Sequence, residues 1–226
     1  MGLDCYACPM PNSINQSFDS SCTRCPRLAE FLSNGKREYP SYHCGPVAPF
    51  GDSQARLIVV GLAPGFHGAN ATGRPFTGDY AGVLLYDTLF KYGFSTASKS
   101  VSINDGLQLI NTRISNAVKC VPPENKPTPA EIKQCNGYLK VELQSLTQPS
   151  VLLTLGTIAH GAVLKAFGLK LGDYKFGHGA EHVLPNQHVL LNSYHCSRYN
   201  TSTRRLTEVM FHQVFARAQS LLSQLA

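Results

Sequence analysis

A glycine-rich segment, Gly61 to Gly82, holds polar and aromatic side chains of types that bind or react with ligands. Its polar members are His67, Asn70, Arg74 and Asp79, and Phe76 stands among small residues. Closely spaced glycines let the backbone approach a ligand and adopt angles that other residues resist. The segment lacks the Gly-x-Gly-x-x-Gly pattern of a dinucleotide site. It is either a ligand-binding loop or a flexible surface loop.

Two further segments combine residues that could do chemistry. One runs from Asn116 through Lys119 to Cys120. The other spans residues 193–205, where His195 is followed by three arginines, Arg198, Arg204 and Arg205. A histidine in such a cationic setting is a better functional candidate than a lone histidine, which is usually structural.

The eight cysteines indicate a metal site more than a disulfide framework, because the chain is expected to be intracellular. Cys5 and Cys8 form one Cys-x-x-Cys pair and Cys22 and Cys25 a second. Two further cysteines bracket a proline-rich loop and two stand alone: Cys120 and Cys135, then Cys44 and Cys196. Four thiolates suit an iron–sulfur cluster or zinc, and spacing does not separate the two.

The elements that must position these segments alternate between strand and helix. Apolar runs at 57–60, 151–155 and 189–191 predict buried strands. The Thr128, Pro129 and Glu131 pattern predicts a helix from there toward Leu146, and an amphipathic pattern predicts a C-terminal helix over 206–225. We therefore expect an α/β fold, a central parallel sheet between helices, with ligands bound at the carboxyl ends of its strands.

Length and composition fit one domain spanning 1–226, with an irregular Cys-rich wrap at 1–50 and an α/β/α core at 51–226. No apolar run approaches the roughly 18 residues of a membrane span, and the N-terminus does not resemble a secretion signal. The sequence therefore predicts a cytoplasmic protein without a membrane partner, with monomer as the default state. The formal net charge of +6 favours a polyanionic partner such as nucleic acid.

Taken together, the Gly-Leu-Ala-Pro start of the first segment, the Asn116-x-x-x-Cys120 segment and the His195-x-Ser197 segment resemble family 5 of the uracil-DNA glycosylase superfamily, in the family's order. The resemblance runs from Cys22 to the C-terminal helix. It implies an enzyme that flips a deaminated base out of DNA and hydrolyses its bond to the sugar, leaving an abasic site.

The resemblance also assigns roles in the base pocket. Phe76 would stack on the flipped base, and Asn116 would read its edge through the amide. His195 would hydrogen-bond the base oxygen on which charge develops. Gly61 and Ala63 of the first motif would line the pocket. The plainer alternatives are loop packing for Phe76, an Asx turn for Asn116 and a structural role for His195.

One departure from related families concerns the group that positions or activates the attacking water. Those families carry Asp, Asn or Glu inside the first motif, where this chain has Leu62 and Ala63. Asp79 is our candidate for the missing carboxylate, with Asn70 as the alternative and an N-cap as the plainer role of Asp79. Without a strong base inside the motif, we expect uracil and also hypoxanthine and xanthine to be accepted.

The resemblance further implies a [4Fe–4S] cluster, favoured over zinc, on the four ligands Cys22, Cys25, Cys120 and Cys135. It would pin the N-terminal wrap to the sheet. The expected DNA phosphate contacts are Arg198, Arg204 and Arg205, with Arg74 and Lys119 as secondary candidates. Cys196 stands where relatives usually have proline. The competing functions are a non-catalytic, metal-stabilised nucleic-acid-binding module and a hydrolase of free nucleotides.

Overall fold

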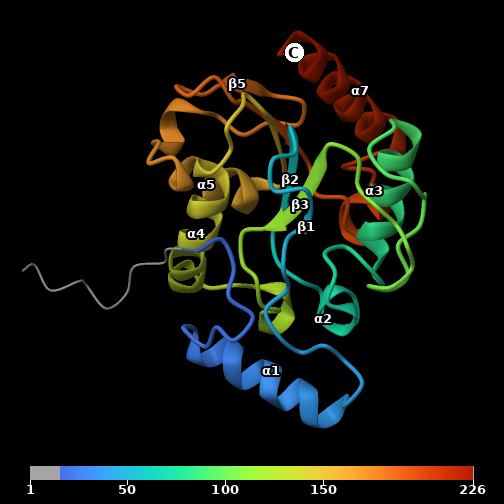
Figure 1. The fold of residues 1–226 in the computed structure, drawn as a ribbon, viewed down its shortest axis with the longest axis vertical. Helices are drawn as coiled ribbons and strands as arrows, with labels where there is room; N and C mark the ends of the chain where they lie inside the picture. The colour runs from blue at the N-terminus through green and yellow to red at the C-terminus, as the bar shows by residue number, and fades with distance from the viewer. Residues whose placement is uncertain (1–15, 226) are drawn as a thin grey trace, which may run out of the picture.

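A computed structural model describes residues 16–225, and its centre is one six-stranded sheet (Figure 1). Cys5 and Cys8 lie outside these residues. The strand order is β1-β3-β2-β4-β6-β5. The strands are β1 Phe50–Gly51, β2 Leu57–Gly61, β3 Thr112–Asn116, β4 Val151–Leu155, β5 Glu181–Val183 and β6 Val189–Ser193.

The sheet is parallel at its centre and antiparallel at both edges. The four inner strands, β3, β2, β4 and β6, are parallel to one another. The edge strands are antiparallel to their neighbours, β1 to β3 and β5 to β6. The α/β class predicted from the sequence is confirmed. The prediction of a parallel sheet holds for the four inner strands, and the two short edge strands are an addition.

Helices cover both faces of the sheet, α4 and α5 on one and α3 and α7 on the other (Figure 1). The α-helices are α1 Pro26–Glu38, α2 Ala69–Thr72, α3 Tyr80–Lys91, α4 Pro129–Gln144, α5 Thr157–Ala166, α6 Arg198–Ser202 and α7 Glu208–Gln224. Short 3-10 turns lie at η1 Pro123–Asn125 and η2 Leu171–Asp173.

The apolar run of β2 shows why the sheet is buried on both sides. Leu57 and Val59 belong to the core under α3 and α7, while Ile58 and Val60 belong to the core under α4 and α5. Successive side chains of a strand point to opposite faces, so a continuous apolar run feeds both cores. The three strands predicted from such runs correspond to β2, β4 and β6.

The predicted helices at 128–146 and 206–225 correspond to α4 and α7. Thr128 and Glu131 form a complete capping box at the start of α4, and Thr207 caps α7. In the described part of the chain no helix is both long and apolar enough to cross a membrane.

The prediction of an irregular N-terminal wrap is wrong between residues 26 and 38, which form α1. Leu28 and Leu32 of α1 pack in a third apolar cluster with Cys120, Cys135 and Tyr138. α1 begins at Pro26 without a side-chain cap or an acidic first turn, so its start carries little signal beyond the proline.

Candidate active site

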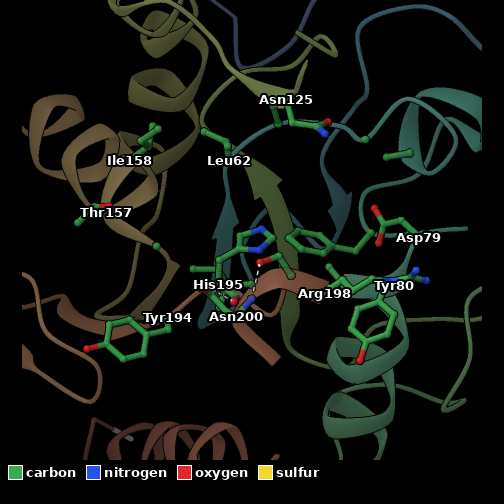
Figure 2. A pocket seen from close by; sticks show the side chains of 18 of the residues that line it. Leu62, Asp79, Tyr80, Asn125, Thr157, Ile158, Tyr194, His195, Arg198 and Asn200 are labelled. Atoms are coloured by element: carbon green, nitrogen blue, oxygen red, sulfur yellow. Dashed lines mark hydrogen bonds between the residues drawn. The ribbon is translucent and has the colours of Figure 1, made fainter. Parts of the chain in front are cut away.

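A pocket of about 500 Å³ opens at the carboxyl ends of the inner strands (Figure 2). Its walls come from the loops that follow β2, β4 and β6 and from the start of α3. This is where an open α/β sheet is expected to bind a ligand. The predicted site residues among its lining are Ala63, Phe76, Asp79, His195, Arg198 and Arg205.

Gly61 and Asn116, two further predicted site residues, are not among the lining residues; they are paired in register at the ends of β2 and β3. A β-carbon on Gly61 would stand 2.5 Å from Asn116 Oδ1 and 2.6 Å from the Phe76 ring, so only glycine fits. Asn116 is buried, and its Oδ1 accepts no hydrogen bond from any described residue. A buried amide oxygen without a partner is costly, which makes it a candidate for ligand contact.

Phe76 has a left-handed backbone, with φ of 55°, a conformation that L residues adopt rarely. Its ring lies 6.0 Å from that of His195, with an angle of 28° between the planes. A β-carbon on Gly82 would overlap the carbonyl oxygen of Phe76, so α3 can pack against this turn only through glycine. The two aromatic rings together form one wall of the pocket.

His195 is presented by the loop between β6 and α6. Its carbonyl accepts a hydrogen bond of 2.8 Å from Asn200 Nδ2, and the neighbouring Cys196 thiol contacts the Ala81 carbonyl at 3.5 Å. Burial lowers the pKa of His195 to about 4. The imidazole is therefore neutral near pH 7, with one ring nitrogen able to donate a hydrogen bond.

Asp79 is at once the N-cap of α3 and a wall of the pocket (Figure 2). Its Oδ1 accepts from the Gly82 amide at 2.8 Å. Its Oδ2 faces Gly68, where a β-carbon would come within 2.7 Å. Burial raises the pKa of this carboxyl, while backbone hydrogen bonds from Gly82 and Ala81 partly offset that rise. The two roles considered for Asp79 are therefore compatible.

Asn70 is not part of the pocket lining, contrary to its prediction as the alternative water-positioning group. It is fully buried in α2, and its Nδ2 donates to the Phe66 carbonyl at 3.3 Å and approaches Cys44 Sγ at 3.5 Å. The Asn70 amide nitrogen therefore helps to hold the glycine-rich loop in place, whereas its Oδ1 has no hydrogen-bond partner among the described residues. Because Asp79 lines the pocket and Asn70 does not, Asp79 stays our candidate for the group that activates water.

The prediction of Arg74 and Lys119 as phosphate contacts is wrong, because both side chains are buried in ion pairs. Arg74 is 4% exposed and its Nη1 lies 2.7 Å from Asp105 Oδ1. Lys119 is 2% exposed and its Nζ lies 3.3 Å from Glu142 Oε2 and 2.6 Å from Ser115 Oγ. Neither cation is available to a ligand in solution.

The remaining cations lie at the pocket rim or outside it. The Arg198 guanidinium lies 5.0 Å from the centre of the Tyr80 ring, and that of Arg205 lies 4.8 Å from the centre of the Tyr194 ring. Both residues line the pocket and both are exposed. Arg204 is exposed but is not part of the pocket lining.

Several lining residues were not predicted from the sequence. They are mainly aromatic or amide side chains, in loops, in short helices or at the start of α3: Tyr80, Asn125, Phe176, Tyr194 and Asn200. Three of them are close in sequence to predicted residues: Tyr80 follows Asp79, Tyr194 precedes His195, and Asn200 lies five residues after His195. Asn125 and Phe176 come from distant loops, and no local pattern connects them with the pocket.

The four cysteines expected to hold metal line one small cavity beneath α1. The Lys119 amide lies 3.2 Å from Cys135 Sγ, and such amide contacts are usual around iron–sulfur clusters. Burial and the nearby thiols raise the pKa of Cys25 to about 11 and that of Cys120 to about 12. A bound cation reverses this preference for the thiol form, so the donors fit a thiolate-ligated metal. Within residues 16–225, however, no three potential ligands are arranged closely enough to hold an ion.

The fold and this pocket agree with the matches to known proteins. The model of the uracil DNA glycosylase superfamily matches residues 48–219, and the chain belongs to this superfamily.

Within the superfamily the relatives named type-5 uracil-DNA glycosylase are similar over nearly the whole chain. One from Thermus thermophilus is 44% identical, covering 89% of this chain and 94% of its own. One from Pyrobaculum aerophilum is 42% identical, covering 88% of each chain. A type-4 uracil-DNA glycosylase from Archaeoglobus fulgidus is 33% identical, covering 63% of this chain and 64% of its own. The chain is a member of the type-5 group.

Proposed function

We propose that this protein is a monofunctional DNA glycosylase that excises uracil from DNA and leaves an abasic site. The observations that carry the proposal are that Phe76 and His195 line one pocket, and that the buried, unpartnered amide oxygen of Asn116 and the Phe76 ring both border Gly61. A pocket that offers an aromatic face and a hydrogen-bond donor, with a buried amide beside the aromatic ring, suits a flipped base.

In this pocket each side chain has a distinct task. The Phe76 ring stacks on the base, and the Asn116 amide, whose oxygen accepts from an N–H of the base, selects its edge. Neutral His195 donates a hydrogen bond to the base oxygen as the bond to the sugar breaks. Water then adds to the sugar, whose positive charge Asp79 stabilises.

The monofunctional assignment rests on the absence of an amine nucleophile. No lysine is among the described residues that line the pocket. Strand cleavage through a Schiff base requires such an amine, so the product is an intact strand with an abasic site.

We propose hypoxanthine and xanthine as further substrates. Leu62 and Ala63 line the pocket where related families carry the polar side chain that activates water. An apolar wall does not strongly reject a base of different shape, and a cavity of about 500 Å³ has room for a purine.

We propose that Cys22, Cys25, Cys120 and Cys135 hold a [4Fe–4S] cluster. When bound, the cluster supplies cross-linking, because it joins the start of α1 to α4 and to the segment after β3. Cys25 is the residue before α1, and Cys135 lies in the middle of α4. Zinc is the alternative metal for the same four thiolates.

The proposed partner is DNA containing a deaminated base, contacted at its phosphates by Arg198, Arg204 and Arg205, and the proposed state is a single-domain, cytoplasmic monomer. The test is cleavage of a labelled duplex bearing one uracil, hypoxanthine or xanthine, followed by alkali. We expect a strand break only after alkali and only at the damaged base, lost in His195→Ala. Intact DNA from folded, metal-loaded protein would favour a binding module instead.

A further inference from the structure

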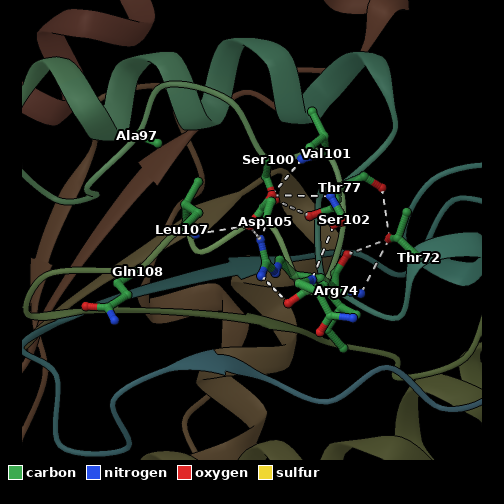
Figure 3. A network of polar contacts seen from close by, with 12 residues as sticks. Thr72, Arg74, Thr77, Ala97, Ser100, Val101, Ser102, Asp105, Leu107 and Gln108 are labelled. Atoms are coloured by element: carbon green, nitrogen blue, oxygen red, sulfur yellow. Dashed lines mark hydrogen bonds and ion pairs between the residues drawn. The ribbon is translucent and has the colours of Figure 1, made fainter.

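A buried polar network surrounds the segment that carries Phe76 (Figure 3). Arg74 Nη1 donates to Asp105 at 2.7 Å and to Ser100 Oγ at 3.0 Å, and its Nη2 donates to the Ile103 carbonyl at 2.7 Å. The Arg74 guanidinium also stacks over Phe50, with its central carbon 4.4 Å from the centre of that ring. Arg74 is thus fixed from the loop at 100–105 and from β1.

Asp105 in turn organises the loop that meets Arg74. Its Oδ2 accepts from the amides of Val101 at 2.8 Å and Ser102 at 3.2 Å. Its Oδ1 accepts from the Leu107 amide at 3.0 Å as well as from Arg74. These bonds hold the pKa of Asp105 well below its usual range. A permanently ionised carboxylate therefore fixes this loop on Arg74.

The network holds the residues on both sides of Phe76. Thr77 Oγ1 and Ser100 Oγ are 2.7 Å apart, and the Tyr86 hydroxyl donates to the Pro75 carbonyl at 2.9 Å. Phe76 itself, held between Pro75 and Thr77, has φ of 55°. A left-handed backbone is unfavourable for an L residue and persists only when its surroundings impose it.

We propose that Asp105, acting through Arg74, is a positioning residue that holds the Phe76 ring in the base pocket. Three contacts connect Asp105 with the segment that carries Phe76: Asp105 with Arg74, Arg74 with Ser100, and Ser100 with Thr77. Thr77 directly follows Phe76 in the chain. This inference rests on the proposed function, because it concerns how the same pocket holds its base.

The test is a double-mutant cycle with Asp105→Asn and Phe76→Leu, measured as single-turnover excision of uracil. If Asp105 acts through Phe76, Asp105→Asn lowers excision about tenfold in the wild-type background and less than about twofold when residue 76 is leucine. Equal losses in both backgrounds would overturn the proposal, because a general effect on folding is additive. Affinity for undamaged duplex stays unchanged, since neither residue is among the proposed phosphate contacts.

Two further variants make the cycle decisive. Ser100→Ala removes the hydroxyl that bridges Arg74 and Thr77, and it replaces Asp105→Asn in the cycle if that variant does not fold. It should likewise lower excision when residue 76 is phenylalanine and have little effect when residue 76 is leucine. Glu181→Gln breaks the exposed Arg217–Glu181 pair, whose shortest contact is 2.6 Å, and leaves excision unchanged. A wild-type protein without excision would refute the proposed function, whereas an active protein with an additive cycle would refute only this inference.

Discussion

The side-chain oxygen of Asn116 lies 2.5 Å from the point where a β-carbon on Gly61 would stand. The two residues are paired across neighbouring strands, so neither backbone can retreat without disturbing the sheet. The missing side chain at position 61 is therefore what allows the Asn116 amide and the Phe76 ring to meet.

Gly61→Ala is expected to lower uracil excision at least tenfold, because the added methyl group displaces Asn116 or Phe76. Gly172→Ala is the matched control, since a β-carbon there meets no atom within 4 Å and its backbone does not require glycine. Single-turnover rates and melting temperatures of both variants check this. Full activity in Gly61→Ala would show that the pocket tolerates a shift of both side chains.

His195 is expected to titrate near pH 4, measured by NMR of the imidazole. Because its folded pKa is below the ordinary value of 6.5, the unfolded chain binds the proton first as pH falls. The stability from burying neutral His195 is therefore present above about pH 6.5 and is lost as pH falls toward 4. His195→Ala should flatten this part of the stability profile and abolish excision. A midpoint near 6.5 would contradict the buried neutral form.

Asp79→Asn and Asp79→Ala should separate the two roles of this side chain. Asparagine is as good an N-cap as aspartate, so Asp79→Asn should fold with nearly wild-type stability but lose about 100-fold in excision. Asp79→Ala should lose activity and also about 1 kcal/mol of stability. Thr207→Ala removes the cap of α7 and should affect stability alone. Wild-type turnover in Asp79→Asn would reduce Asp79 to a helix cap.

Replacing Lys119 or Arg205 by alanine should affect different properties, the stability of the fold in one case and DNA binding in the other. Lys119→Ala removes one of the two cations beside buried Glu142, which keeps its pair with Arg113, and is expected to destabilise the fold by about 1–3 kcal/mol without changing the salt dependence of DNA binding. Arg205→Ala should leave the melting temperature unchanged and reduce the slope of log affinity against log salt by about 1. The comparison needs chemical denaturation and binding titrations at several salt concentrations.

Protein purified without oxygen is expected to contain about four iron atoms per chain, with inorganic sulfide and visible absorption. Cys22→Ser should lose this metal and melt at a lower temperature. Cys44→Ser should retain it, because Cys44 is not among the residues that line the four-cysteine cavity. If the protein instead contains one zinc ion per chain and no sulfide, the four cysteines form a zinc site and not an iron–sulfur cluster.

The sequence predicted the elements whose signals are local. Apolar runs marked β2, β4 and β6, and a capping box marked α4. β3 was missed because Thr112–Asn116 is largely polar: Arg113 and Ser115 reach Glu142 of α4, and this partner lies far along the chain.

The same limit explains the outcome for the site. The residues of the glycine-rich segment and His195 follow strands directly, so their meeting at one sheet edge could be expected. The fate of Arg74 depended on Asp105, which lies in a loop without a pattern of its own. Charge alone does not tell whether a cation meets solvent or a buried carboxylate.

The left-handed backbone of Phe76 also bears on the entropy of base binding. Because the chain bends this residue into place as it folds, an arriving nucleotide meets a wall that is already assembled. The entropy of ordering the aromatic wall is then lost once in the life of each molecule and not at every base that is inspected. Binding of a flipped base therefore requires no further ordering of the Phe76 backbone.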